Sequence, residues 1–379
     1  MGPSSTSQRD VYLRAAALYP SSTQAAYGEA PPGLGVAGGW CAFAMLELIQ
    51  RGKAGATRSA IPVGMLWDRD WARDVADAAA GLDNILSPRA RIAGLSLDRP
   101  RIMGIVNVTP DSFSDGGVHA STNAAIAHGL QLVADGADIL DVGAESTRPG
   151  SDAVPEAAEL ARLLPVIEGL VAKTDVPISV DTRKAAVMRA AVKAGARIIN
   201  DVSALTFDPA SLAAAASCDV PVVLMHAQGD PKTMQTAPAY RDVLLDVYDD
   251  LAARIAVCEA AGIARQKLIV DPGIGFGKTI EHNLALMSGL SLFHSLGVPV
   301  LVGASRKRFI GTLTGVEVAA ERVHGSVGAA IAAVAQGAQI VRVHDVKATR
   351  EALAVWLASW QACGPASGPA SKSGASHQG

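Results

Sequence analysis

The stretch ADGADILDVG, residues 134–143, decides the fold, because the same phrase returns as KAGARIINDV (193–202) and AQGAQIVRVH (335–344). Each copy has a small-residue helix end, a glycine suited to a helix C-cap, an alanine, and a short β-branched run that ends in polar residues. The phrase is therefore a joint between a helix and the following strand. Its repetition predicts a chain built from strand–helix units.

Outward from these joints, eight apolar runs are interpreted as strands, and Ala-rich stretches between them as helices. Continuous apolar runs fit a parallel sheet covered on both faces. The predicted strands are 102–108, 139–142, 178–180, 198–200, 222–225, 268–270, 300–302 and 340–343, and the helices include 123–134, 184–194, 240–261 and 319–335. Eight units in about 265 residues match an α/β fold, the (β/α)8 TIM barrel, whose usual size is about 250 residues. A doubly wound open sheet is the alternative, but even repeats without a reversal favour the barrel.

The chain is expected to have three regions. Residues 96–362 form the TIM barrel. Residues 1–95 form an N-terminal extension, a candidate small appended domain with helical-looking stretches around 40–52 and 68–86. Residues 363–379 lack apolar anchors, so a disordered tail is expected. Capping the barrel bottom, oligomerisation and binding another enzyme all remain open as roles for the extension.

Composition excludes several classes of protein. The 379 residues are 49% hydrophobic, enough for a large core, and the formal net charge of −3 lacks the basic footprint of a nucleic-acid binder. No apolar run reaches the roughly 20 residues that span a bilayer. The four cysteines are scattered, which favours free thiols in a reducing compartment. We therefore expect a cytoplasmic protein with no nucleic-acid or membrane partner.

Polar residues gather directly after the predicted strands. In a barrel these strand ends and the loops that follow face one mouth, where such enzymes keep their sites. One of these loops, DPGIGFGKT (271–279), looks at first like a phosphate-binding loop. It is not a Walker A motif, because Gly273 and Gly277 enclose three residues rather than four. Its glycines instead let the backbone pass close to a flat ligand.

The strand-end motifs, in order, resemble those of dihydropteroate synthases, and the resemblance covers about residues 100–350. The matching segments are GIVNVTPDSFSDGG (104–117), DVGAESTRPGS (141–151), VDTRKA (180–185), INDVSA (199–204), LMHAQGDPKTMQ (224–235), DPGIGFGK (271–278), GASRKR (303–308) and RVHDV (342–346). The sequence departs little from the family pattern: Ala144 stands where glycine is usual, and Arg183 and Ala304 occupy variable positions. Residues 1–95 lie outside the resemblance.

This resemblance implies a transferase of a pterinylmethyl group in folate biosynthesis. The family condenses 6-hydroxymethyl-7,8-dihydropterin pyrophosphate with p-aminobenzoate, giving 7,8-dihydropteroate and pyrophosphate. It also implies a homodimer, Mg²⁺ as cofactor, and sulfonamides as inhibitors that bind in the p-aminobenzoate pocket.

A pterin presents a flat donor–acceptor edge, so burying it requires carboxylates and amides that pair with it. Asp181, Asn200 and Asp271 end the third, fourth and sixth predicted strands and can converge, although any one such aspartate is equally explained as a helix N-cap. The resemblance places these three in the pterin pocket with Met225, Gly303 and Lys307. It places Asp141 near the reacting side of the pterin, where a loop-bracing role is the alternative.

The departing pyrophosphate needs cations and donors. The resemblance implies Arg148, Arg342 and His344 for this role, and Asn107 as both a pyrophosphate contact and the Mg²⁺ ligand. The p-aminobenzoate pocket would be lined by Thr147, Pro149, Phe276, Ser305 and Lys307. The expected catalytic set is Asp141, Arg148, Asp181, Lys307, Arg342 and His344.

Loops 108–118 and 143–154 are expected to close over the substrates, with Asp111 and Ser112 as candidates without a defined role. Of the lysines in DPGIGFGK and GASRKR, Lys307 rather than Lys278 is expected to be the functional one. Two other functions remain open. A non-catalytic pterin-binding or assembly module would keep the barrel without turnover. A methyltetrahydrofolate-dependent methyltransferase would share the pterin carboxylates but have no use for the pyrophosphate set.

Overall fold

A closed parallel barrel forms the centre of the molecule. The computed structural model describes residues 10–21, 34–66, 76–108, 117–145, 154–229 and 238–362. Within them, eight parallel strands form one sheet in the order β10-β9-β8-β7-β6-β5-β12-β11. A parallel bridge between Val270 of β10 and Val300, just before β11, joins the two ends of the sheet. The predicted TIM barrel is therefore confirmed, and the open sheet is excluded.

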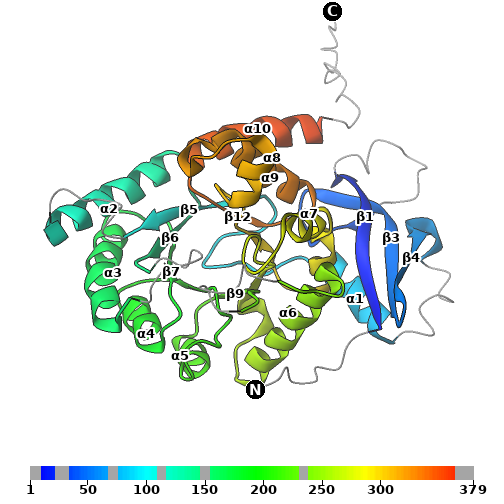
Figure 1. Cartoon of the computed structure of the whole chain (residues 1–379), viewed down its shortest axis with the longest axis horizontal. Coiled ribbons are helices and arrows are strands. Elements are labelled where there is room, and N and C mark those ends of the chain that lie inside the picture. The colour runs from blue at the N-terminus through cyan, green and yellow to red at the C-terminus, as the bar shows by residue number, and fades with distance from the viewer. Residues whose placement is uncertain are drawn as a thin grey trace, which may run out of the picture.

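Every predicted barrel strand is present, and Figure 1 shows the helices arranged around them. The strands are β5 (Arg101–Asn107), β6 (Ile139–Gly143), β7 (Ile178–Asp181), β8 (Ile198–Asp201), β9 (Val222–Met225), β10 (Leu268–Asp271), β11 (Leu301–Val302) and β12 (Ile340–Val343). The helices that cover them are α2 (Gly117–Ala134), α3 (Glu156–Val171), α4 (Ala185–Lys193), α5 (Ser211–Cys218), α6 (Val243–Ala260), α7 (Ile280–Ser288), α8 (Arg308–Thr314), α9 (Val323–Ala335) and α10 (Val346–Gln361). Short 3-10 turns, including η6 (Leu290–Leu296), complete the connections.

The three repeated joints close their helices in the same way. Gly136, Gly195 and Gly337 have φ of 102°, 110° and 84°, the left-handed region that favours glycine. The amide of the alanine after each glycine donates to the carbonyl five residues earlier, at 2.9, 2.9 and 3.1 Å. This is the Schellman closure of a helix end. After each closure the chain reverses direction and starts the next strand at the bottom of the barrel. The polar ends of these strands therefore lie at the opposite mouth.

The bottom of the barrel is filled by a separate apolar layer. Ile92 pairs with Leu95 in an antiparallel bridge, and Ile92 and Leu97 pack against apolar side chains from seven strands. Those side chains are Met103, Ile139, Ile198, Val223, Ile269, Leu301 and Ile340. The short segment before β5 therefore plugs this end of the barrel, opposite the polar strand ends.

The extension is mainly an antiparallel sheet. Strand β3 (Cys41–Gly52) pairs with β1 (Val11–Pro20), β2 (Leu34–Gly35) and β4 (Gly55–Pro62). The helix predicted around 40–52 is therefore wrong. Its Ala, Met, Leu and Glu residues favour helix on their own, but pairing on both edges overrides that weak preference. Helix α1 (Ala76–Leu86) lies within the predicted stretch 68–86, and residues 67–75 and 363–379 are outside the described residues.

This sheet packs directly against α6 and η6 of the barrel. Figure 1 shows β1, β3 and β4 at one side of the barrel. The ring of Tyr248 on α6 lies edge-on to Tyr12 of β1, at 5.4 Å between centroids, and 6.3 Å from Phe293 of η6. The indole Nε1 of Trp40 donates to the carbonyl of Val334 on α9, at 2.9 Å. The extension and the barrel therefore share one continuous apolar core.

The cysteines and the hydropathy of the helices agree with the expectations from the sequence. Cys41, Cys218 and Cys258 are free thiols, and Cys363 lies outside the described residues. Of the helices that the structure describes, none has the length and hydropathy needed to cross a membrane.

We predict that Tyr248→Ala lowers the free energy of unfolding by about 3–5 kcal/mol, because it leaves a cavity between Tyr12 and Phe293. The measurement is urea denaturation. Val355→Ala is the control, since Val355 is 72% exposed on α10 and should change the free energy by less than about 0.5 kcal/mol. Equal values for the two variants would contradict a shared core.

Candidate active site

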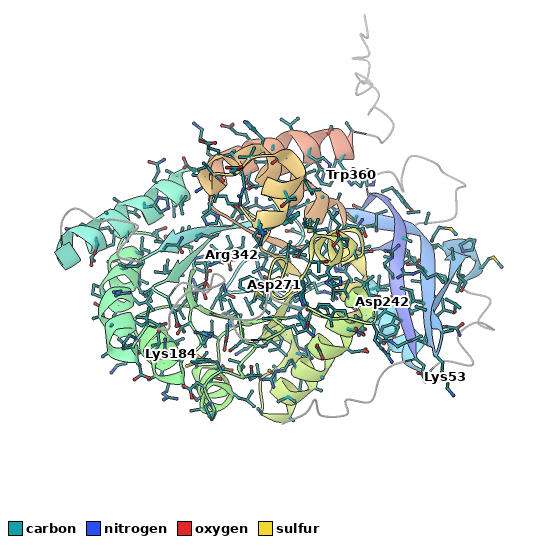
Figure 2. All side chains as sticks on the ribbon, viewed as in Figure 1. Lys53, Lys184, Asp242, Asp271, Arg342 and Trp360 are labelled. Carbon is teal, nitrogen blue, oxygen red and sulfur yellow. The ribbon has the colours of Figure 1, made fainter. Side chains whose placement is uncertain are left out.

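An arginine joins two buried aspartates across the middle of the barrel mouth. Arg342 of β12 donates from Nε to Oδ2 of Asp141, at 2.6 Å, and from Nη2 to Oδ2 of Asp181, at 2.8 Å. Asp141 and Asp181 lie on β6 and β7, and β5 separates these strands from β12. The guanidinium therefore reaches through the barrel interior, and Figure 2 shows Arg342 and Asp271 near the middle of the ring of helices.

The Asp141 carboxylate has one oxygen occupied and the other unpaired. Asn200 Nδ2 donates to Asp141 Oδ2, at 3.0 Å, so this oxygen serves both Asn200 and Arg342. The other oxygen, Oδ1, is buried and has no hydrogen-bond partner among the described residues. An unsatisfied buried acceptor costs about 1–3 kcal/mol. The site therefore presents an acceptor that a bound N–H donor would satisfy.

Burial also alters the proton affinity of this group of carboxylates. Burial raises the pKa of Asp181 to about 7, with the negative charge of Asp141 adding to the effect and Arg342 opposing it. The carboxyl therefore exchanges a proton near neutral pH. Such shifted carboxyls in a barrel mouth are typical of functional sites.

The opposite wall of the mouth is formed by the ends of β10 and β11. Asp271 accepts a hydrogen bond from the amide of Gly273, at 2.7 Å, and burial raises its pKa against the attraction of Lys307. Lys307 donates to the carbonyl of Ile274, and its Nζ lies 4.5 Å from the centroid of the Phe276 ring. Burial lowers the pKa of Lys307 to about 8. A carboxylate and an aromatic ring of the β10 loop thus meet a cation from the β11 loop.

Gly303 lies between the two walls. A side chain there would place its Cβ 3.8 Å from Oδ2 of Asp271 and 3.8 Å from Cβ of Arg342. Those are ordinary contact distances, and the backbone conformation of Gly303 does not require glycine. The absence of a side chain therefore mainly leaves space at the centre of the mouth.

The loops after β11 and β12 are tied together. Ser305 Oγ lies 3.0 Å from His344 Nδ1 and accepts a hydrogen bond from the His344 amide, at 3.2 Å. Arg306, with a φ of 58°, forms two hydrogen bonds with Asp345, at 3.0 and 2.5 Å. The strained arginine thereby fixes Ser305 and Lys307 on either side of it.

The structure brings most of the predicted residues to this one mouth. Asn107 ends β5 and is half-buried, and Met225 ends β9 with 5% exposure. The mouth also holds Asp141, Asp181, Asn200, Asp271, Phe276, Gly303, Ser305, Lys307, Arg342 and His344. The predicted residues Thr147, Arg148, Pro149, Asp111 and Ser112 lie outside the described residues.

The prediction missed a charged cluster beside Asp181. Glu145 accepts from Arg183 Nη2 and from Lys184 Nζ, both at 2.9 Å. Lys184 also pairs with Glu159, at 2.5 Å, and Glu159 accepts from Thr182 Oγ1, at 2.6 Å. These residues lie in the quoted motifs GAESTRPGS and VDTRKA or on the following helix. No single motif could indicate that they pair across two loops.

Comparison with known proteins places this site in a family. Residues 103–344 match the family described as pterin binding enzyme. The chain is 56% identical over 269 residues to dihydropteroate synthase of Neisseria meningitidis serogroup B, covering 70% of this chain and 94% of that protein. The chain belongs to the dihydropteroate synthase family. The family and enzyme class expected from the sequence are thereby confirmed.

Solved structures of dihydropteroate synthases agree with this membership. The Xanthomonas albilineans enzyme with 4-aminobenzoic acid is 56% identical, with a TM-score of 0.68, and the match covers 72% of this chain and 98% of that one. The same enzyme in complex with 7,8-dihydropteroate is 54% identical, with a TM-score of 0.66 and the same coverage. A Yersinia pestis dihydropteroate synthase with a sulfonamide drug is 49% identical, with a TM-score of 0.67, covering 70% of this chain and 96% of that one.

We predict that Asp181→Asn reduces turnover by at least about 100-fold, because it removes a charge that the site holds in place. A carboxyl whose pKa is raised on folding contributes stability below its ordinary pKa and loses it as pH rises toward 7. Asparagine does not titrate, so the melting temperature of the variant relative to wild type should rise between pH 5 and pH 8. Asp83→Asn, at an exposed position, is the control. A constant difference in melting temperature across this range would contradict the raised pKa.

Proposed function

We propose that this dihydropteroate synthase condenses 6-hydroxymethyl-7,8-dihydropterin pyrophosphate with p-aminobenzoate at the mouth formed by Asp141, Asp181, Asp271, Lys307 and Arg342. The observation that supports this most is the unpaired Oδ1 of Asp141, a buried acceptor beside two further carboxylates. A pterin edge supplies the N–H donors that such acceptors need. The resulting 7,8-dihydropteroate is the compound bound in the Xanthomonas albilineans complex.

The pterin would lie between the two walls. Asp141, Asp181 and Asn200 on one side and Asp271 on the other offer oxygens and an amide to the ring edge, while the side chain of Met225 contributes an apolar contact. Since Arg342 already pairs with Asp141 and Asp181, it holds both carboxylates in place for the ring edge. We propose this as its first role in the site.

The same arginine can also serve the leaving group. A guanidinium has five N–H donors, and the two ion pairs use Nε and one hydrogen of Nη2, so Nη1 remains available for an anion. As the carbon–oxygen bond to pyrophosphate breaks, negative charge grows on the leaving oxygen. Arg342, His344 and Arg148 would stabilise it. The amine of p-aminobenzoate attacks the methylene carbon and releases its proton to solvent.

A magnesium ion fits this site through one protein ligand. Asn107 ends β5 and is half-buried beside Gly143 in register, so its amide oxygen can face the mouth. Among the described residues, no group of three or more His, Cys, Asp or Glu side chains could hold a metal. Mg²⁺ commonly takes one or two protein oxygens, water and substrate phosphates, which agrees with a single ligand. When bound, it would neutralise charge on the pyrophosphate.

The p-aminobenzoate pocket would lie between Phe276, Ser305 and Lys307, with Thr147 and Pro149 completing it. Lys307 over the Phe276 ring places a cation where the carboxylate of p-aminobenzoate would bind, and Ser305 adds a hydroxyl. Because relatives are known with 4-aminobenzoic acid and with a sulfonamide drug, we propose that both bind here. Homodimerisation and a cytoplasmic location are also proposed for this chain.

The proposed reaction is tested by following pyrophosphate release from the pterin pyrophosphate and p-aminobenzoate. We expect turnover by wild type and a fall in kcat/KM of at least about 100-fold in Arg342→Met, which keeps the aliphatic stem. Because removing the guanidinium leaves two buried carboxylates unpaired, the variant should also lose about 3–5 kcal/mol of stability, so turnover is measured where circular dichroism shows it to be folded.

Intact pterin binding without pyrophosphate release by wild type would refute the synthase reaction. A folded Arg342→Met variant that keeps the wild-type kcat/KM would show that the arginine is structural rather than catalytic.

For the metal, we predict that chelation of Mg²⁺ lowers turnover and that readdition restores it. Asn107→Ala should raise the Mg²⁺ concentration for half-maximal turnover by about tenfold. This factor corresponds to the loss of one contact worth about 1.4 kcal/mol. Asn84→Ala, on α1 at the bottom of the barrel, is the matched control. An unchanged Mg²⁺ requirement in the Asn107 variant would rule out this residue as the ligand.

A further inference from the structure

Lys278 lies at the end of the DPGIGFGK loop, and its side chain is buried. Only 3% of the residue is exposed. Its Nζ lies 2.9 Å from His226 Nδ1, 2.9 Å from the carbonyl oxygen of Phe276 and 3.3 Å from the carbonyl oxygen of His226. An ammonium group has three N–H donors, so these three acceptors use all of them. Lys278 therefore has no donor left for a phosphate.

The protonation of His226 follows from its two neighbours. Its Nδ1 accepts from Lys278, so its Nε2 carries the hydrogen and donates to Asp250 Oδ2, at 3.1 Å. Burial lowers the pKa of His226 to about 4, with the charge of Lys278 acting in the same direction. The ring is therefore neutral at physiological pH. It links Lys278 to Asp250 on α6, whose side chain is 60% exposed.

These contacts fasten two strand-end loops together. The backbone after β10 passes so close to that after β9 that a Cβ on Gly273 would lie 1.8 Å from the His226 carbonyl oxygen. A Cβ on Gly277 would lie 2.5 Å from the carbonyl oxygen of Gln228. Lys278 lies between the two loops and is hydrogen-bonded to both. Of its three bonds, the one to the Phe276 carbonyl directly fixes the backbone of a residue in the mouth.

We propose that Lys278 is a positioning residue that sets the affinity of the site for p-aminobenzoate by holding the backbone of Phe276 against the β9 loop. The proposal rests on the proposed function, in which the Phe276 ring and Lys307 line the p-aminobenzoate pocket. Lys278 acts through Phe276 and contacts no substrate. The pterin side depends on it less, because Asp271 is held within β10 by the barrel itself and is attracted more strongly by Lys307 than by Lys278.

The charge of Lys278 matters because three acceptors surround it. A neutral amine has two N–H donors, so deprotonation would leave one of the three acceptors without a hydrogen. Burial lowers the pKa of Lys278 to about 7. The charged groups that face it are Asp271 of β10 and Asp250 of α6, which favour the charged form, and Lys307 after β11, which opposes it. The imidazole of His226, directly after β9, is neutral, as described above.

It follows that binding of p-aminobenzoate should weaken as pH rises through this range. Asp250 offers a way to shift the effect without touching the buried lysine. Asp250→Asn removes a negative charge that favours the charged lysine, while an amide oxygen can still accept from His226. The weakening should therefore begin at a lower pH in this variant.

The experiment measures KM separately for p-aminobenzoate and for the pterin pyrophosphate, from pH 6 to pH 9, in the full chain. In Lys278→Met we expect KM for p-aminobenzoate to rise about tenfold or more, the loss of about one hydrogen bond to a charged group, while KM for the pterin pyrophosphate changes less than about twofold. In Asp250→Asn we expect the rise in KM for p-aminobenzoate to shift toward lower pH. Asp175→Asn is the matched control, because Asp175 is exposed in the turn before β7, at the opposite end of the barrel.

Equal increases in both KM values in Lys278→Met, or a pH profile of Asp250→Asn that coincides with that of Asp175→Asn, would overturn the proposal. If Lys278→Met does not fold, the exposed Asp250 variant decides alone. Absence of wild-type turnover would refute the proposed function, whereas normal wild-type turnover with unchanged variant profiles would refute this inference only.

Discussion

The shared guanidinium of Arg342 makes it possible to collect negative charge inside this barrel. Parallel strands direct their carboxyl ends to one mouth, and in this chain several of those ends carry aspartate. Asp141 and Asp181 are almost completely buried, and the charge of Asp141 opposes ionisation of Asp181, which Arg342 favours. Arg342 forms ion pairs with both. The shape and charge of the pterin side of the site depend on this arrangement.

The other side of the mouth is built on backbone rather than on charge. The glycines of the β10 loop allow two strand-end loops to come within contact distance, and lysines on both sides of the loop donate to its carbonyl groups. Lys307 lies over the Phe276 ring, whereas Lys278 lies between the β9 and β10 loops. Two lysines from different loops therefore contact the β10 loop, one beside the proposed ligand pocket and one that fixes the loop itself.

The sequence predicted the barrel well because its signals are local. The joint around Gly136 repeats at Gly195 and Gly337, and a glycine at a helix end has a conformational reason that needs no tertiary information. The strand-end position of a residue also indicates its side of the barrel, so the grouping of Asp181, Asn200 and Asp271 could be predicted.

What the sequence could not predict depends on pairing between distant segments. The apolar run at β3 has helix-forming residues and becomes a strand only because β1 and β4 pair with it. Arg342 was expected at the pyrophosphate, but its partners in the structure are carboxylates 201 and 161 residues away in the chain. The sequence gives Lys278 no role, because the motif is not a phosphate-binding loop. The partner that explains this lysine, His226, lies in a different motif 52 residues away.

The extension has a consequence for how this protein can be compared with its relatives. The Neisseria meningitidis relative is matched over 94% of its length by only 70% of this chain, and the family match begins at residue 103. A chain trimmed to the region of the match would expose the rings of Tyr248 and Phe293 and leave the Trp40 contact of α9 empty. This face of the barrel is therefore interior in this protein. Any assembly of two copies must therefore use a face other than the one that the extension covers.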